Sequence, residues 1–237
     1  MSNNFFKFKQ FTVFQDHCAM KVGTDGVLLG AWSRIDGCAN VLDVGTGTGL
    51  IALMIAQRNC NVCIDAIDID KGCVLQAQHN VANSTFSHRI DVQQKPFQDF
   101  AQQVDKKYDL IISNPPYFQN SLKSPVLTRN YARHNDSLSF YEIISEGALL
   151  LNERGCVSLI LPYEFKQTIL EHAKSVNLHP HRIANVFPVA HKPAKRLLVE
   201  FAKYEEQCIE EDIIIERSRH QYTDEFKALT IDFYLDK

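Results

Sequence analysis

Three short stretches of the chain carry side chains that could do chemistry. The first reads Asp43-Val44-Gly45-Thr46-Gly47-Thr48-Gly49, the second is the single residue Asp68, and the third is Asn114-Pro115-Pro116-Tyr117. Each stretch ends or follows a short apolar run typical of a buried strand. When such strands are parallel, ligands bind beyond their carboxyl ends, so the three stretches are expected to meet at one edge of a sheet.

The first stretch has glycine at alternate positions, which lets the backbone turn tightly and approach a ligand without Cβ atoms in the way. Its third glycine comes one residue earlier than in the dinucleotide fingerprint, and no Gly-Lys-Ser/Thr follows to grip phosphates. The carboxylate of Asp43 would repel phosphate and suits a cationic or amine-bearing ligand. A plain tight turn is the alternative interpretation.

Asp68 lies nineteen residues after Gly49, close to the spacing of an acid that binds ribose hydroxyls. Its alternative role is to cap the following helix, but Asp70 suits that position better. Together the two motifs predict a nucleoside ligand that has no diphosphate at the turn. S-adenosylmethionine, which has a ribose diol, a sulfonium cation and an amino-acid end, meets these requirements.

The third stretch predicts a rigid corner, because Pro115 and Pro116 lack backbone donors and have fixed φ angles, and proline also restrains Asn114 before it. The Asn114 side-chain oxygen and the Pro115 carbonyl can each accept one N–H of a planar exocyclic amine, which aims the nitrogen lone pair at a sulfonium methyl group. This is catalysis by orientation and electrostatic placement. Tyr117 offers a face on which a flipped base can stack. A simple strand-terminating turn would explain the prolines alone.

The elements that must position these motifs are apolar runs alternating with amphipathic stretches. Strands are expected over residues 39–44, 62–68, 89–93, 108–113, 155–161, 183–187 and 197–202. Helices are expected from the glycine turn to about residue 58, and over 70–83, 138–151 and 163–176. Continuous apolar strands separated by helices predict βαβ units and a parallel sheet that is covered on both faces, an α/β fold.

The length of 237 residues, with 45% apolar and 22% charged residues, is that of an ordinary globular protein. We expect a single domain with an N-terminal extension (1–38), a core (39–204) and an acidic C-terminal extension (205–237). The chain has no apolar run long enough to span a membrane and no secretory signal pattern. Seven irregularly spaced cysteines predict free thiols in a reducing cytoplasm, and no second pair follows Cys60 and Cys63, so no metal is expected.

The net charge of −3 is distributed unevenly. Residues 166–199 hold six Lys or Arg against one acid, whereas residues 203–237 hold five against ten acids. An acidic protein with one basic block can still bind a polyanion locally, although a solvated helix face and a charged tail would give the same pattern. The candidates for contacts to RNA phosphates are Lys123, Arg129, Arg133, Lys192, Lys195 and Arg196.

With these motifs in hand, the chain resembles the class I S-adenosylmethionine-dependent methyltransferases that modify adenine N6. More narrowly, Met20–Trp32 and the Lys192–Arg196 pattern resemble the tRNA(Val) adenine-N6 methyltransferase family. The resemblance implies a Rossmann-like three-layer sandwich with a mostly parallel seven-stranded sheet and an antiparallel strand near the C-terminus. It also implies methylation of adenine 37 beside the anticodon, with the anticodon arm of a valine tRNA as partner and no protein partner required.

The resemblance further implies which residues hold S-adenosylmethionine. These are Thr24, Asp25, Asp43, Gly45, Thr46, Gly47, Gly49, Asp68, Phe97 and Asn114. Thr24 and Asp25 would lie by the methionine end of the cofactor. The stretch after the third strand departs from the family pattern, and there Phe97 would supply an apolar contact and Asp99 an acceptor for the cofactor adenine.

Several other functions remain open at this point. The same corner motif serves enzymes that methylate a glutamine amide in release factors, although only about 38 residues precede the first expected strand of the core, little room for their helical domain. DNA adenine methylation is a second alternative, disfavoured because no target-recognition domain is evident. A nicotinamide-dependent oxidoreductase is disfavoured by the early third glycine and the corner. A non-catalytic RNA-binding module would need only the basic block.

Overall fold

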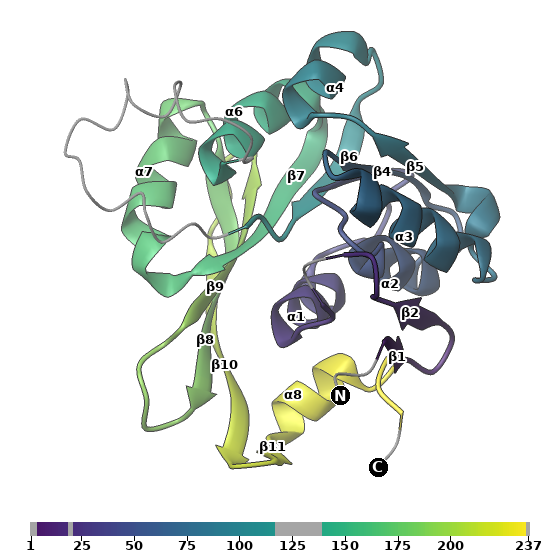
Figure 1. Ribbon diagram of the computed structural model, residues 1–237. Coiled ribbons are helices and arrows are strands. Elements are labelled where there is room, and N and C mark those ends of the chain that lie inside the picture. The colour runs from purple at the N-terminus through teal and green to yellow at the C-terminus, as the bar shows by residue number, and fades with distance from the viewer. Residues whose placement is uncertain (1–3, 19–20, 117–138, 236–237) are drawn as a thin grey trace.

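The computed structural model describes residues 4–18, 21–116 and 139–235. It has a nine-stranded sheet in the order β11-β10-β8-β9-β7-β6-β3-β4-β5 and a separate two-stranded hairpin (Figure 1). The hairpin consists of β1 (Phe5–Lys7) and β2 (Thr12–Phe14). The strands of the large sheet are β3 (Asn40–Val44), β4 (Cys63–Asp68), β5 (Ile90–Gln94), β6 (Tyr108–Ser113), β7 (Leu151–Pro162), β8 (His179–Val189), β9 (Arg196–Ala202), β10 (Ile209–Ser218) and β11 (Gln221–Tyr222).

The helices cover both faces of the large sheet. They are α1 (Thr24–Trp32), α2 (Leu50–Arg58), α3 (Lys71–Ala82), α4 (Phe97–Gln103), α6 (Phe140–Leu150), α7 (Lys166–Ser175) and α8 (Asp224–Thr230), with 3₁₀ turns at Ser87–Arg89 and Tyr163–Phe165. Within the described residues, no helix combines the length and the apolar character needed to cross a bilayer.

The sheet is parallel from β5 through β4, β3 and β6 to β7, and β9 then runs antiparallel between β7 and β8. The chain moves outward in one direction from β3 to β5 and in the other direction from β6 onward. The order therefore reverses between β3 and β6, and a ligand crevice is expected beyond the carboxyl ends of these two strands. The expected mixed α/β fold with an antiparallel strand toward the C-terminus is confirmed.

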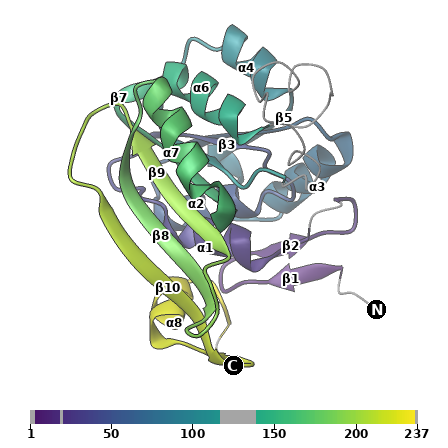
Figure 2. The same cartoon turned by 90° about the vertical axis from the view of Figure 1, so that its left-hand side faces the viewer.

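Two apolar clusters lie on opposite faces of the sheet, because successive side chains of a strand point to opposite sides. Val41 packs with α1, α2 and α3 on one face, whereas its neighbour Leu42 packs with α4, α6 and α7 on the other. Figure 2 shows these two groups of helices on either side of the sheet. Both faces of the central strands are thus buried, which explains their continuous apolar sequence.

The sheet has two strands more than the seven expected, because residues after 205 add β10 and β11. Strand β10 pairs in parallel with β8, with Ile209 opposite Arg182. Sequence reasoning missed this strand because its acids bond to residues that are distant in sequence: Lys166 Nζ and Asn185 Nδ2 both donate to Glu210 Oε1, and Asn185 Nδ2 also donates to Asp212 Oδ1 at 2.9 Å. In the sequence alone this segment looks like a charged tail, because the residues that pair with it are distant in the chain.

The chain ends meet on the α1 and α2 side of the molecule (Figure 1). Lys9 N donates to Phe233 O at 2.8 Å, and the rings of Phe8 and Tyr234 stack with centroids 6.0 Å apart. Phe8 and Phe233 are almost completely buried. The N-terminal hairpin therefore uses the C-terminal residues as part of its apolar support.

Helix α1 packs closely on α2 through two glycines one turn apart. A Cβ on Gly26 would lie 3.0 Å from Leu50 Cδ2, and one on Gly30 would lie 2.8 Å from Met54 Sδ. Residues 26–32 are all buried, so α1 has no polar face and lacks the helical periodicity that sequence analysis looks for. The first turn of α1 consequently lies against the first residue of α2.

Gly30→Ala should destabilise the protein, because the new methyl group forces Met54 to move. Overpacking costs about 1–3 kcal/mol, which exceeds the gain of about 1 kcal/mol from replacing a helical glycine. We expect a net loss of about 1 kcal/mol in the free energy of unfolding, measured by urea denaturation. In a Met54→Ala background, where part of the clash is relieved, the loss should be smaller. A Gly30→Ala variant as stable as wild type would contradict this packing.

Candidate cofactor and substrate site

The glycine turn has the open shape that a ligand needs. Gly45, Gly47 and Gly49 all have positive φ, at 71°, 57° and 81°, where other residues are strained. No atom of the described residues lies within 4 Å of a Cβ built on Gly45, whereas one on Gly49 would lie 3.3 Å from Ala77 Cβ. Gly49 is therefore required for packing against α3, and Gly45 leaves space beside the backbone.

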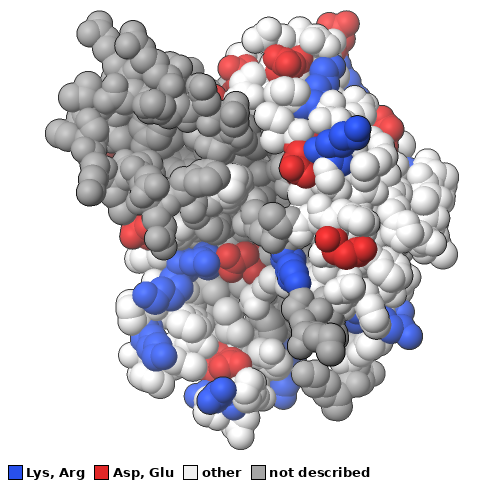
Figure 3. All heavy atoms as spheres, in the orientation of Figure 1, with Lys and Arg blue, Asp and Glu red and all other residues white. Residues whose placement is uncertain are grey.

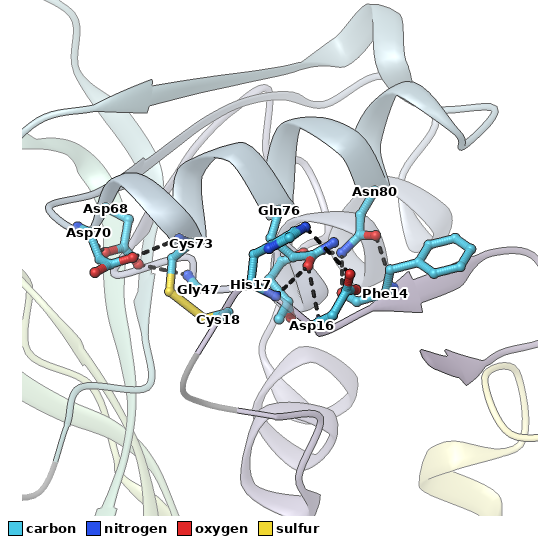
Figure 4. Close-up of a disulfide and its surroundings, with 11 residues drawn as sticks. Phe14, Asp16, His17, Cys18, Gly47, Asp68, Asp70, Cys73, Gln76 and Asn80 are labelled. Carbon is cyan, nitrogen blue, oxygen red and sulfur yellow. Dashed lines mark hydrogen bonds and ion pairs between the residues drawn. A yellow bond between two sulfur atoms is a disulfide. The ribbon is translucent and has the colours of Figure 1, made fainter. Parts of the chain in front are cut away.

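The turn is fixed to the end of β4 by backbone and carboxylate bonds. The N–H groups of Gly45 and Thr46 donate to Ile67 O at 2.9 and 3.0 Å. Asp68 accepts from Gly47 N at 2.8 Å with Oδ2 and from Asp70 N at 2.9 Å with Oδ1 (Figure 4). A carboxylate has about four lone-pair positions, so this half-buried group keeps capacity for a vicinal diol. Asp70 caps α3 by accepting from Cys73 N at 2.8 Å, as the sequence predicts.

Asp43 is a fully buried carboxylate whose two oxygens differ in their hydrogen bonds. Thr46 Oγ1 donates to its Oδ2 at 2.6 Å, whereas Oδ1 has no hydrogen-bond partner among the residues described. The pKa of Asp43 is raised to about 7, mainly by burial and to a smaller extent by the charge of Asp68, against the lowering effect of the Thr46 hydroxyl and the nearby Ala52 amide. Such an oxygen fits a cationic group of a ligand, which would favour the ionised form.

The Asn-Pro-Pro corner follows directly on β6, beside the glycine turn. Ser113, fully buried, donates its hydroxyl to Val44 O at 2.7 Å and so joins the carboxyl ends of β6 and β3. Pro115 is buried, and Asn114 and Pro116 are half-buried. The structure thus brings the start of the corner next to the glycine turn, at the switch point of the sheet. Tyr117 lies outside the described residues.

The start of α1 reaches the same edge. Asp25 is half-buried in the first turn of α1, next to Gly26, which packs on Leu50 directly after the glycine turn. Thr24 is exposed at the first position of the helix. The carboxylate of Asp25 accepts from Arg196 Nε at 2.7 Å. Asp25, which the sequence assigns to the cofactor, and Arg196, which it assigns to RNA, therefore form an ion pair.

Phe97 and Asp99 lie in the first turn of α4, near Asp68. Lys95 N donates to Asp68 O at 2.9 Å, which fixes the loop before α4. Phe97 is only 3% exposed and belongs to the apolar cluster that contains Val44, whereas Asp99 is exposed. Phe97 therefore packs in the core, and only a small part of its side chain is open to a ligand.

Apart from Arg196, which pairs with Asp25, the candidate RNA contacts fall into two groups. Lys192 and Lys195 are exposed in the turn between β8 and β9, and Figure 3 shows Lys and Arg side chains gathered over the lower part of this face, where β8 to β10 lie. Lys123, Arg129 and Arg133 lie outside the described residues.

Sequence reasoning missed a disulfide between Cys18 and Cys73, and the expectation of free thiols is wrong for this pair. The segment before Cys18 lies along α3, where Gln76 Oε1 accepts from Asp16 N and His17 N at 3.1 and 3.0 Å (Figure 4). Gln76 is almost completely buried, and no local sequence pattern indicates that it holds the N-terminal segment beside Cys73. A Cβ on Gly47 would lie 3.9 Å from Cys18 Sγ, so the disulfide borders the glycine turn.

Asn80, one helical turn after Gln76, reinforces this attachment. Its side chain accepts from Phe14 N at 2.9 Å and donates to Phe14 O and Thr48 O, both at 2.8 Å. It therefore links the N-terminal segment to the glycine turn. Cys60 and Cys63 are exposed, and the described residues contain no group of three or more His, Cys, Asp or Glu side chains that could hold a metal ion.

The sequence was compared with protein-family models and with curated proteins. The methyltransferase small domain model matches residues 23–138. Proteins named tRNA1(Val) (adenine(37)-N6)-methyltransferase are 48% identical in Parabacteroides distasonis, over 99% of both chains, and 44% identical in Trichodesmium erythraeum, again over 99% of both. A protein of that name in Flavobacterium psychrophilum is 42% identical over 97% of this chain and 99% of its own.

Solved structures share the fold at much lower identity. A predicted O-methyltransferase from Agrobacterium tumefaciens superposes with a TM-score of 0.65 at 18% identity, covering 88% of this chain and 96% of its own. A ribosomal protein L11 methylase from Lactobacillus delbrueckii subsp. bulgaricus gives 0.54 at 18% identity, covering 76% and 77%. A putative class I S-adenosylmethionine-dependent methyltransferase from Listeria monocytogenes also gives 0.54, at 15% identity, covering 79% and 62%.

Asp43 should make stability fall as pH rises, because its folded-state pKa of about 7 lies above the value of 3.8 expected when unfolded. Between these values the folded protein holds a proton that the unfolded chain has lost. From pH 4 to pH 7, the free energy of unfolding of Asp43→Asn should therefore rise relative to wild type by up to about 4 kcal/mol, measured in urea. Asp91→Asn, at an exposed carboxylate, is the control. Parallel pH profiles for Asp43→Asn and wild type would contradict the shift.

Proposed function

Because the chain belongs to the tRNA1(Val) (adenine(37)-N6)-methyltransferase family, we propose that it transfers a methyl group from S-adenosylmethionine to N6 of adenine 37 in a valine tRNA. The observation that carries this proposal is the position of the Asn114–Pro116 corner. It follows β6 directly, and the bond from Ser113 to Val44 O fixes it beside the glycine turn. The proposed amine site and the proposed cofactor site would therefore lie side by side at one edge of the sheet.

The cofactor residues fit S-adenosylmethionine on two structural grounds, the open space at Gly45 and the unpartnered oxygen of Asp43. Asp68 would bind the ribose hydroxyls, and Asp43 and Asp25 would face the cationic methionine end. When bound, S-adenosylmethionine supplies an electrophilic methyl group on a sulfonium. The protein's part is to hold this group at a fixed place in the crevice, where orientation lowers the barrier.

The amine is oriented by acceptors of the corner. The exocyclic amine of adenine is a weak nucleophile because its lone pair is delocalised into the ring. The side-chain oxygen of Asn114 and the carbonyl of Pro115 would each accept one N–H, which directs the lone pair toward the methyl group. These acceptors also stabilise the positive charge that develops on the nitrogen. We assign base stacking to Tyr117 as a sequence-based proposal.

The tRNA would approach over the basic turn between β8 and β9. Lys192 and Lys195 are exposed there and are suited to phosphate contacts of an anticodon arm, which position the RNA without reading its sequence. We assign Lys123, Arg129 and Arg133 to the same role from the sequence alone. Cytoplasmic localisation and a single functional domain over residues 1–237 are part of this proposal.

The acceptor can be identified with labelled methyl groups. Purified protein should transfer label from S-adenosylmethionine to tRNA from cells lacking the gene, and nucleoside mass spectrometry should find N6-methyladenosine at position 37 of a valine tRNA. Duplex DNA and release factors serve as competing acceptors in parallel reactions. Label in a glutamine amide or in DNA instead of tRNA would overturn the proposed acceptor.

Asn114→Ala should lose methyl transfer but keep cofactor affinity. The lost contact is made to the substrate amine and gains strength in the transition state, so we expect kcat to fall by about 100-fold or more. The dissociation constant for S-adenosylhomocysteine, measured by calorimetry, should stay close to that of wild type. The matched control is Asn61→Ala, at an exposed asparagine in the turn before β4. Methylation by Asn114→Ala at the wild-type rate would refute the role of this residue.

A further inference from the structure

Arg196 lies at the edge of the sheet that carries the glycine turn. It is the first residue of the antiparallel strand β9 and pairs with Pro162, the last residue of β7. Since β7 runs parallel to β6, Pro162 lies at the same edge as the end of β6. Arg196 therefore lies on the cofactor side of the sheet, although the sequence groups it with the lysines of the basic turn.

The guanidinium group of Arg196 points into this edge. Its Nε donates to Asp25 Oδ2 at 2.7 Å, and the two side chains are 33% and 27% exposed. Its NH1 donates to Lys195 O at 3.0 Å. The side chains of Lys192 and Lys195, by contrast, are exposed. Geometry thus separates the arginine from its two basic neighbours.

The backbone that carries Arg196 is itself fixed. Lys195 N donates to Val186 O at 2.8 Å, and Tyr163 N donates to Lys195 O at 3.2 Å. The end of β7 and the hairpin of β8 and β9 are thereby joined just before Arg196. A charge-assisted bond from such a base can set the position of the residue that accepts it.

Strand β9 holds α1 at both ends. At the far end, Arg34 N donates to Oε1 of the buried Glu200 at 2.7 Å. At the near end, the bond from Arg196 to Asp25 is the corresponding attachment. Because Gly26 packs on Leu50, directly after the glycine turn, the position of Asp25 determines how the start of α1 meets that turn. Arg196 Nε donates to Oδ2 of Asp25, and the second oxygen makes no hydrogen bond to any described residue, so it is available as an acceptor for a ligand.

We propose that Arg196 is a positioning residue of the cofactor site, which fixes Asp25 toward the cationic methionine end of S-adenosylmethionine, and that it is not a phosphate contact for RNA. The inference rests on the proposed function, because it takes the cofactor from there. Within the Lys192–Arg196 pattern, the exposed Lys192 and Lys195 would contact RNA, whereas Arg196 would support the cofactor site.

The test measures binding of S-adenosylhomocysteine by calorimetry and of tRNA over a range of salt concentrations. Arg196→Ala and Asp25→Asn should each raise the dissociation constant for S-adenosylhomocysteine by about tenfold, because each variant loses one charge-assisted hydrogen bond. The double variant should be little worse than the weaker-binding single variant, because both changes remove the same pair. Arg196→Lys, which keeps the charge but not the fork, should recover part of the affinity.

Salt dependence distinguishes the two roles of the basic residues. Lys192→Ala and Lys195→Ala should each reduce the slope of log affinity for tRNA against log salt by about 1, because one phosphate contact is lost. Arg196→Ala should leave that slope unchanged. Arg217→Ala, which removes the exposed ion pair with Asp224 at the far end of the chain, is the matched control and should change neither measurement.

Unchanged affinity for S-adenosylhomocysteine in Arg196→Ala, with a reduced salt slope for tRNA, would overturn the inference and return Arg196 to the RNA surface. Additive effects of Asp25→Asn and Arg196→Ala would also overturn it. The pair of Asp25 and Arg196 is partly open to solvent, where an ion pair contributes little to stability, so these variants should fold, which circular dichroism verifies. A wild-type protein that does not bind S-adenosylhomocysteine would refute the proposed function instead, so the two failures are distinguishable.

Discussion

A backbone turn with three positive φ angles is the constraint on which the rest of the site depends. Gly45, Gly47 and Gly49 let the chain reverse from β3 into α2 while its N–H groups bond the end of β4 and the carboxylate of Asp68. A side chain at Gly45 would enter the space beside this turn. Under the proposed function the turn sets the position of the cofactor, and the Asn114 corner can act on a substrate because the sheet places it alongside.

The central part of the fold could be predicted from the sequence because its signals are local. Strand β6 begins and ends at the expected residues, and Asp70 caps α3 as predicted. The glycine turn and the Asn-Pro-Pro corner are likewise encoded in a few consecutive residues. What they share is that backbone geometry, fixed by Gly and Pro, decides the structure before any distant contact forms.

The features that were missed depend on contacts between distant parts of the chain. Residues 26–32 of helix α1 are all buried, so this part of its sequence has no periodicity. Strand β10 is recognisable only once Lys166 and Asn185 are seen beside its acids, and the pair of Cys18 with Cys73 requires the N-terminal segment to lie along α3. The bond between Asp25 and Arg196 joins residues 171 positions apart. No window of sequence contains both partners.

The contact between the chain ends has a consequence for how the molecule tolerates shortening. The hairpin of β1 and β2 rests on Phe233 and Tyr234, and it leads directly into the segment that Gln76 and Asn80 attach beside the glycine turn. Deleting the last few residues would therefore loosen a segment about two hundred positions upstream, and the effect would reach the glycine turn. The C-terminal residues Phe233 and Tyr234, although distant in sequence from the glycine turn, thus support the N-terminal segment that packs beside it.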